Sequence, residues 1–202
     1  LAGKSAIQQQ DVGLVRDVFV AKVPYTVAEV GNEADHETTL EGMLLKAAEP
    51  IVKKHKPSPR TAFVLATTKG EIGYLAESDA AQAMLTVLAR KIARKLHIVT
   101  EPIIVSHACV SGVLAITVAK RLIQMGLYDD AFVLAGDEAS EFVLSGFQAF
   151  QAMSPFPCRP FDQNRAGVSL GDAAACVYLS LEAGPFQVTG DAAINDANHI
   201  SG

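Results

Sequence analysis

The chain has 202 residues, of which 50% are hydrophobic and 19% charged, and its formal net charge at pH 7 is −5. This composition is typical of a globular protein with one sizeable core or two small ones, and the acidic balance argues against a general nucleic-acid-binding protein, which is normally basic. No apolar run approaches the roughly 20 residues of a membrane span, and the N-terminus lacks a signal-peptide pattern. We therefore expect a cytoplasmic protein that binds neither nucleic acid nor membrane.

Hydrophobic periodicity predicts helices that alternate with short strands. Leu1–Ile7 is expected to be the tail of a passage from a helix into a loop. The chain order that we then expect is a helix over Leu40–Lys54, a strand over Phe63–Ala66, a helix from Ser78 or Asp79 to Leu96, a strand over Ile103–Val105, a helix that ends at Gly126, a strand over Ala131–Ala135, a helical segment over Ser145–Met153, a loop over Pro155–Gly167, and strands over Ala173–Leu181 and Phe186–Ala193. This order predicts an α/β fold with a mixed five-stranded sheet covered by helices on both faces.

The stretch Ile103–Gly126 carries the strongest chemical signal. A short buried strand leads into a tight turn of small residues, and the helix that follows is apolar almost all the way round, as expected of a helix in the middle of a protein. Cys109 lies at the N-terminus of that helix, where unpaired backbone N–H groups and the positive end of the helix dipole stabilise a thiolate. A buried structural cysteine is the alternative, but the position and the small flanking residues favour a nucleophile.

The other two cysteines are expected to be structural. Cys176 lies in an apolar strand, and Cys158 precedes Arg159, whose charge would stabilise a thiolate, although we favour a packing role. The three cysteines are odd in number and far apart, without metal-ligand or disulfide spacing, so we expect no metal and a reducing compartment. The run Gly70–Gly73 lacks the residues of a phosphate-binding loop, and we expect no cofactor.

Three sequence blocks, in their order and spacing, resemble those of the β-ketoacyl synthases, the condensing enzymes of fatty-acid and polyketide synthesis. Ser106–Gly112 resembles the nucleophile block. Cys158–Gly167, followed by Gly171–Ala174, resembles the family's R-P-F-D-x-x-R-x-G and G-(acidic)-x-A blocks, and Asn195–Ser201 resembles its D-A-x-H loop. The resemblance is good from Phe63 onwards and weak before it.

The resemblance implies a thiolase-like fold, which is built from two similar halves. Residues 1–202 then correspond to the N-terminal half-domain without its first strand, incomplete at both ends, and the second half would begin near residue 185. The span from Gly70 to Cys109 is shorter than is usual in the family and lacks its Pro-Asn segment. The preferred acyl-chain length therefore does not carry over.

In such enzymes the cysteine takes an acyl chain from a carrier-protein thioester, and the carbanion left by decarboxylation of a carrier-bound malonyl group attacks the acyl-cysteine. The resemblance implies an acyltransferase in which Cys109 is the catalytic residue and its amide forms half of an oxyanion hole. Two histidines of the second half support this chemistry, and their motifs are not in this sequence. We therefore expect the chain alone to be inactive in condensation, although it can still be acylated at Cys109.

Two alternatives share this fold. A degradative thiolase uses the same cysteine on coenzyme A thioesters, but the R-P-F-D block and the D-A-x-H loop argue against it. A non-catalytic or truncated partner subunit of a condensing enzyme would act by pairing with a catalytic one, but such partners usually lose the cysteine, which is present here. An α/β-hydrolase would need a G-x-S-x-G motif, which the sequence lacks.

The candidates for lining the acyl tunnel or supporting the nucleophile are His107, Ser111, Phe147 and His199. His107 could tune the nearby cysteine, but a histidine satisfied within the core is favoured. Phe147 matches a tunnel-lining position of the family, with core packing as an equal alternative, and His199 matches the D-A-x-H loop rather than a catalytic histidine. Asp162 and Arg165 could bind a ligand, but a buried structural pair that holds their loop is favoured.

The implied partner is an acyl carrier protein, and the chain is expected to form a homodimer or a heterodimer. A cluster of basic side chains could steer an acidic carrier towards the chain, with plain helix-end charge as the equal alternative. This basic cluster comprises Arg90, Lys91, Arg94, Lys95, Lys53, Lys54 and Lys56.

Overall fold

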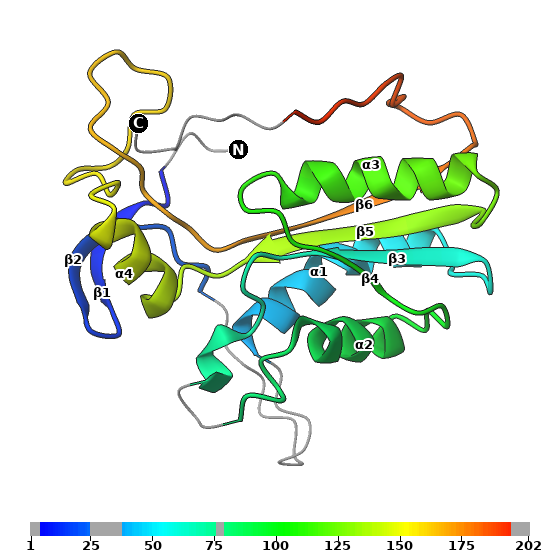
Figure 1. Ribbon diagram of the computed structural model, residues 1–202, viewed down its shortest axis with the longest axis horizontal. Coiled ribbons are helices and arrows are strands. Elements are labelled where there is room, and N and C mark those ends of the chain that lie inside the picture. The colour runs from blue at the N-terminus through cyan, green and yellow to red at the C-terminus, as the bar shows by residue number, and fades with distance from the viewer. Residues whose placement is uncertain (1–4, 25–37, 76–78, 195–202) are drawn as a thin grey trace. The chain divides into compact units, whose positions relative to one another are not determined.

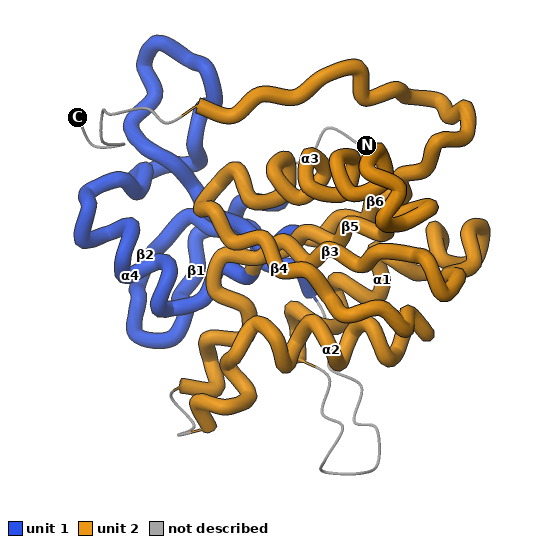
Figure 2. Tube along the Cα trace, turned by 45° about the vertical axis from the view of Figure 1, so that its right-hand side comes forward, with its two compact units in different colours: residues 1–24, 138–173, 195–202 blue, residues 25–137, 174–194 orange. Residues whose placement is uncertain are grey.

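The structure is a computed structural model, which describes residues 5–24, 38–75 and 79–194. They divide into two compact units, drawn in blue and orange in Figure 2. The smaller unit comprises residues 5–24 and 138–173, and the larger unit comprises residues 38–75, 79–137 and 174–194. None of the described helices is long and apolar enough to cross a membrane.

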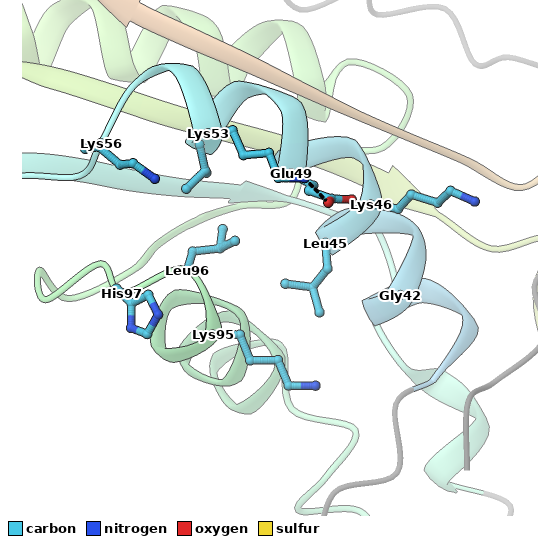
Figure 3. Close-up of a pocket in the computed structure, with 10 residues that line it drawn as sticks. Gly42, Leu45, Lys46, Glu49, Lys53, Lys56, Lys95, Leu96 and His97 are labelled. Carbon is cyan, nitrogen blue, oxygen red and sulfur yellow. Dashed lines mark hydrogen bonds and ion pairs between the residues drawn. The ribbon is translucent and has the colours of Figure 1, made fainter. Parts of the chain in front are cut away.

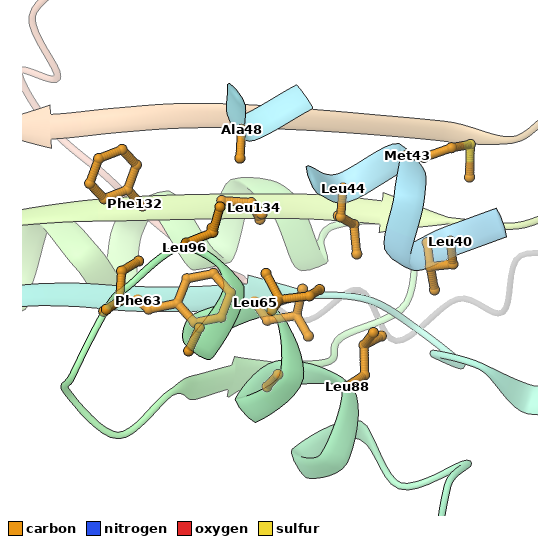
Figure 4. Packing of buried hydrophobic residues seen from close by; sticks show 14 residues of the cluster. Leu40, Met43, Leu44, Ala48, Phe63, Leu65, Leu88, Leu96, Phe132 and Leu134 are labelled. Carbon is orange, nitrogen blue, oxygen red and sulfur yellow. The ribbon is translucent and has the colours of Figure 1, made fainter. Parts of the chain in front are cut away.

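The larger unit is built around a four-stranded sheet in the order β4-β3-β5-β6. The strands are β3 (Thr61–Ala66), β4 (Ile103–Val105), β5 (Asp130–Asp137) and β6 (Ala173–Ser180). β3 pairs in parallel with both β4 and β5, whereas β6 runs in the opposite direction to β5 (Figures 1 and 4). The sheet is therefore mixed, as the sequence predicts.

Helices cover both faces of this sheet. α1 (Thr39–Lys54) and α2 (Leu85–Lys95) lie on one face, and α3 (Ser111–Gln124) lies on the other (Figure 1). Phe63 and its strand partner Phe132 face α1 and α2 (Figure 4), whereas the next pair, Val64 and Val133, faces α3. The alternation places one buried layer on each face, because successive side chains of a strand point to opposite sides.

The start of α2 differs from the prediction. The helix begins at Leu85, and the preceding chain forms a short 3-10 helix, η2 (Ile72–Leu75), and turns. The Asp79 carboxylate accepts a hydrogen bond from the Gln82 N–H (3.3 Å) within one such turn. The buried stripe of α2 begins only at Leu88, so residues 79–84 have little apolar surface to bury as a helix. The predicted alternative cap, Ser78, lies outside the described residues.

The smaller unit contains a hairpin that the sequence analysis missed. β1 (Gln8–Val12) pairs antiparallel with β2 (Val15–Val20), in a stretch for which the sequence analysis predicted no strand. The predicted helix-to-loop passage ends before β1: residues 1–4 lie outside the described residues, and residues 5–7 form neither helix nor strand. Gly13 allows the turn with φ +59°. α4 (Glu141–Ala149) packs Leu144 against Val15, Val18 and Val20 of β2. It begins earlier than predicted, because Ser140 caps it by accepting from the Val143 N–H (3.4 Å).

The predicted strand over Phe186–Ala193 is also absent from the described chain. Residues 181–194 follow β6 without forming a strand, so the sheet has four strands rather than five. Phe186 is 92% exposed, which leaves its side chain without a packed neighbour to define a strand face. Asp191 nevertheless ties this segment to α3. Hydrogen bonds from Lys120 and then Arg121 hold the pKa of the Asp191 carboxyl below its ordinary value.

Candidate active site

Polar loops follow the carboxyl ends of the parallel strands in the larger unit. Thr67 and Thr68 come directly after β3, Ser106 comes directly after β4, and Asp137 is the last residue of β5. In open α/β sheets, ligands bind at this edge, because the loops there leave from several neighbouring strands. Cys109 lies in the loop after β4, so its position agrees with this rule.

Cys109 is held in a tight turn, His107–Val110, that joins β4 to α3; we call it the Cys109 turn. The hydroxyl of Ser111 donates to the Ala108 carbonyl (2.7 Å) and accepts from the His107 N–H (2.7 Å). The Val110 N–H also donates to the His107 carbonyl (3.2 Å). Ala108 adopts the left-handed region, with φ +44°, and Cys109 itself is exposed.

The turn places Cys109 at the N-terminal end of α3. The helix starts two residues later, at Ser111, and continues for 14 residues. Its first turn approaches the sheet closely, because a Cβ atom on Gly112 would lie 3.4 Å from the Ala135 Cβ on β5. The thiol therefore lies at the N-terminus of a long helix, next to the positive end of the helix dipole.

A carboxylate that the sequence analysis passed over lies at the same edge. One oxygen of Asp137, Oδ1, accepts from the Thr67 hydroxyl (2.9 Å), the Thr68 N–H (2.8 Å) and the Thr68 hydroxyl (3.0 Å). The Ser106 hydroxyl in turn donates to the Thr68 carbonyl (3.4 Å). The signal was present in the sequence, because Thr67 and Asp137 are the first polar residues after two apolar strand cores.

The other predicted residues are dispersed. His107 is exposed, so the expectation of a histidine satisfied within the core is wrong. Phe147 is half-buried on α4, in the smaller unit. Arg165 is exposed and donates to the backbone carbonyl of Asp162 (3.1 Å), so the two residues do not form the buried pair that we expected. His199 lies outside the described residues.

The remaining cysteines differ sharply from Cys109 in their surroundings. Cys176 of β6 packs against the core between the sheet and α1, and this burial raises the pKa of its thiol to about 12. Cys158 is half-buried in the smaller unit, where its N–H donates to the Ser169 hydroxyl (3.1 Å). Cys109 is thus the exposed cysteine of the three.

The basic cluster does not form one free cationic surface. Lys91 and Lys95 both contact the buried Glu41 carboxylate, at 2.5 and 2.8 Å, and Arg90 pairs with Glu101. An open groove of about 570 Å³ runs between α1 and the end of α2 (Figure 3); it is lined by Gly42, Leu45, Lys46, Glu49, Val52, Lys53, Lys56, Lys95, Leu96 and His97. Lys53 and Lys56, at the C-terminus of α1, precede the amino end of β3, and Leu96 and His97, after α2, precede the amino end of β4. This end of the groove therefore lies at the amino edge of the sheet, opposite the carboxyl edge where Cys109 lies.

Within the described ranges, no three His, Cys, Asp or Glu side chains are grouped closely enough to hold a metal ion. The groups at the Cys109 edge are instead a thiol, hydroxyls, backbone amides and one carboxylate. This set is suited to nucleophilic acyl transfer, which needs an activated nucleophile and N–H donors for a developing oxyanion.

A family model and several known proteins match this chain. The profile of a family described as "Beta-ketoacyl synthase, N-terminal domain" matches residues 55–183. Two curated relatives are both named Nodulation protein E. The protein from Rhizobium sp. (strain N33) is 33% identical over 104 residues, which are 50% of this chain and 25% of the relative. The protein from Rhizobium leguminosarum bv. trifolii is 36% identical over 78 residues, which are 37% of this chain and 19% of the relative.

Two solved structures share the fold. A ketosynthase, ApeO, solved in complex with its chain length factor from Xenorhabdus doucetiae, superposes with a TM-score of 0.72 and 24% identity over 89% of this chain and 51% of that chain. A β-ketoacyl synthase from Burkholderia phymatum STM815 gives a TM-score of 0.71 and 19% identity over 88% of this chain and 52% of that chain. The fold is therefore the thiolase-like fold of ketosynthases, and the chain spans about half the length of these two structures.

Proposed function

The chain belongs to the β-ketoacyl synthase family, whose N-terminal domain it matches, and on that premise we propose that it is the cysteine-bearing part of a condensing acyltransferase with Cys109 as the nucleophile. The Cys109 turn is the observation that carries this proposal. It presents an exposed thiol at the N-terminus of a long helix and is fixed on both sides of Ala108 by the buried Ser111 hydroxyl. Nucleophilic cysteines occupy such exposed helix N-termini, whereas structural cysteines pack against the core, as the partly buried Cys176 does.

The proposed reaction has two steps. The Cys109 thiolate attacks the carbonyl carbon of an acyl carrier protein thioester, so that a new S–acyl bond forms and the carrier thiol leaves with a proton. A malonyl thioester then loses carbon dioxide, and the electron pair of the broken C–C bond forms a new bond to the acyl carbon. The Cys109 S–C bond breaks in this step, which regenerates the thiolate and releases a β-ketoacyl thioester. The Cys109 N–H supplies one donor to the oxyanion of each tetrahedral intermediate.

We expect this chain by itself to perform the first step only. Decarboxylation in the family relies on two histidines of the second half of the fold, and the chain spans about half the length of the solved relatives. In line with this division of roles, we propose a homodimer or heterodimer, with a carrier protein as the substrate-bearing partner in the cytoplasm. Two of the similar solved structures are of ketosynthases with a chain length factor, which supports a heterodimeric partner of the same fold.

Intact mass spectrometry after incubation with an acyl carrier protein thioester tests this proposal. We expect a single acyl adduct on the chain and none on the Cys109→Ala variant, because the remaining thiols are half-buried or packed in the core. Cys158→Ala is the matched control and should acylate as the original chain does. Failure of the original chain to acylate, or an adduct that persists in Cys109→Ala, would refute the nucleophile and favour a non-catalytic partner subunit instead.

A further inference from the structure

The side chain of Asp137, the last residue of β5, is tied to the loop after a neighbouring strand. Its Oδ1 accepts three bonds from two consecutive threonines, Thr67 and Thr68, which form the start of the loop after the neighbouring strand β3. Thr67 is fully buried, and its hydroxyl also accepts a hydrogen bond from the Gly70 N–H (3.1 Å). This second bond fixes the loop as far as Gly70. The Asp137 carboxylate thus fixes the path of the loop after β3.

Asp137 also lies on the face of the sheet that α3 covers, and α3 is the helix that follows Cys109. Residues two apart on a strand share a face, so Asp137 lies on the same face as Ala135. Ala135 is the residue that Gly112 approaches in the first turn of α3, three residues after Cys109. Asp137 therefore lies two residues beyond Ala135, on the same face of β5 as the contact between Ala135 and Gly112 at the N-terminus of α3.

A second connection reaches the Cys109 turn from the other side. The Thr68 carbonyl, which Asp137 holds in place, accepts from the hydroxyl of Ser106, the residue immediately before the turn. The Ser111 bonds hold the turn to α3. The bond between Ser106 and Thr68 instead holds the turn to the sheet edge.

We propose that Asp137 is a positioning residue for Cys109: through Thr68 and Ser106 it fixes where the Cys109 turn lies on the carboxyl edge of the sheet, and hence how the thiol meets the N-terminus of α3. This inference rests on the proposed nucleophilic role of Cys109. In this proposal the Oδ1 atom of Asp137 positions the turn by accepting hydrogen bonds from Thr67 and Thr68, and the negative charge of Asp137 is not needed.

The rate of alkylation by iodoacetamide, resolved cysteine by cysteine by peptide mass spectrometry, tests the proposal in the full chain. Asp137→Ala removes the acceptor, and we expect Cys109 to react about fivefold more slowly as the thiol moves away from the helix N-terminus. Asp137→Asn keeps an acceptor oxygen but no charge, and Cys109 should react at the original rate or somewhat faster. The matched control is Asp129→Ala, which breaks an exposed pair with Arg60 next to the amino end of β5 and should leave the Cys109 rate unchanged.

The other cysteines serve as internal references. An intact fold leaves the rate at Cys158 unchanged and Cys176 unlabelled in every variant. Equal rates at Cys109 in the alanine, asparagine and original chains would overturn the proposal, and so would an equal increase in both variants, which would indicate an effect of charge alone. If labelling of Cys176 reveals that Asp137→Ala unfolds, Ser106→Ala takes its place, with a two- to threefold slower Cys109 rate expected and an unchanged rate decisive against the proposal.

The outcome also separates this inference from the proposed function. If Cys109 of the original chain reacts no faster than Cys158, the nucleophile itself is refuted whatever the variants do. If Cys109 reacts rapidly but is insensitive to Asp137 and Ser106, only the positioning role is lost.

Discussion

Ser111 holds the Cys109 turn with a hydroxyl that is almost inaccessible to solvent, since the residue is only 4% exposed. The turn needs this support because Ala108 has a φ of +44°. The left-handed region costs a residue with a Cβ roughly 1–2 kcal/mol. The two hydrogen bonds of Ser111 offset that cost and leave the exposed thiol in one defined place.

Replacing this hydroxyl should therefore affect both stability and chemistry. In Ser111→Ala the His107 N–H and the Ala108 carbonyl each lose a partner, which should lower the free energy of unfolding by about 1–3 kcal/mol and slow acylation at Cys109. Urea unfolding and the acylation rate check this expectation. Ser180→Ala removes a hydroxyl that accepts from the Glu182 N–H in an exposed setting and is the matched control. Equal behaviour of the two variants would contradict a role for Ser111 in holding the turn.

At the scale of the elements, the buried carboxylate of Glu41 joins helices α1 and α2. Its side chain is fully buried, and its two oxygens contact the ammonium groups of Lys91 and Lys95 on α2. Two lysines of the basic cluster therefore hold α1 and α2 together on one face of the sheet. An ion pair of this kind contributes through the penalty of breaking it, because a partner left alone is a buried, uncompensated charge.

Glu41→Ala should accordingly lower the free energy of unfolding by about 3–5 kcal/mol. Glu49→Ala is the matched control on the same helix, because Glu49 pairs with Lys53 in an exposed position and its removal should barely change the free energy of unfolding. Urea unfolding of the two variants measures the difference. A loss for Glu41→Ala as small as that for Glu49→Ala would show that the lysines do not depend on this carboxylate.

β6 makes the stability of the larger unit sensitive to alkali. Burial raises the pKa of Cys176 from its ordinary 9.0 to about 12, and burial together with Asp130 raises that of Tyr178 from 10.0 to about 12. Both groups ionise more readily in the unfolded chain, so their contribution is complete below about pH 9 and is lost as the pH rises towards 12. We expect the urea midpoint to fall over this interval, and to fall less steeply in Cys176→Val. Parallel pH profiles for the two proteins would contradict this assignment.

The elements that the sequence predicted are those with strong apolar patterns. α1 has an apolar stripe at helical spacing, and β3, β4 and the core of β5 are short runs rich in apolar residues, whose length favours strands. The β1–β2 hairpin was missed because its first strand, Gln-Gln-Gln-Asp-Val, is polar and mostly exposed, and its pairing depends on β2. Within the candidate site, the sequence predicted that Cys109 lies between a strand and a helix, and it lies between β4 and α3, whereas its role as the nucleophile stays a prediction. The bonds of Asp137 were out of reach, because they join residues 69 and 70 positions apart.

At the scale of the whole molecule, α3 has apolar side chains on its solvent side. Val113 is 71% exposed and Val110 is 52% exposed, next to Cys109, and Met125 and Leu127 are exposed at the other end of the helix. Val110 and Val113 lie together at the N-terminal end of α3, and exposed apolar groups that adjoin one another mark interaction surfaces. We expect a second copy of the chain to cover this face.

The isolated chain should then self-associate at micromolar concentration, and Val113→Glu should shift it towards the monomer by placing a charge on the apolar face. Sedimentation velocity at several concentrations measures this shift. Thr86→Glu, at an exposed position on α2, is the matched control and should associate as the original chain does. A monodisperse monomer of the original chain at all concentrations would contradict a covered α3 face.

The placement of helices on opposite faces of the sheet has a consequence for the location of the chemistry. The connection after β3 leaves towards the face of α2, and the connection after the adjacent strand β4 leaves towards the face of α3. The strand order reverses at β3, because the chain passes from β3 outwards to β4 and then back across β3 to β5. The topological switch point, where ligands bind in sheets of this kind, therefore lies between the carboxyl ends of β3 and β5. Thr67 and Thr68 meet Asp137 there, and Ser106, just before the Cys109 turn, donates to the Thr68 carbonyl. The winding of the chain thus dictates where a reaction can take place, and the residues after β3 and β4 decide which reaction it is.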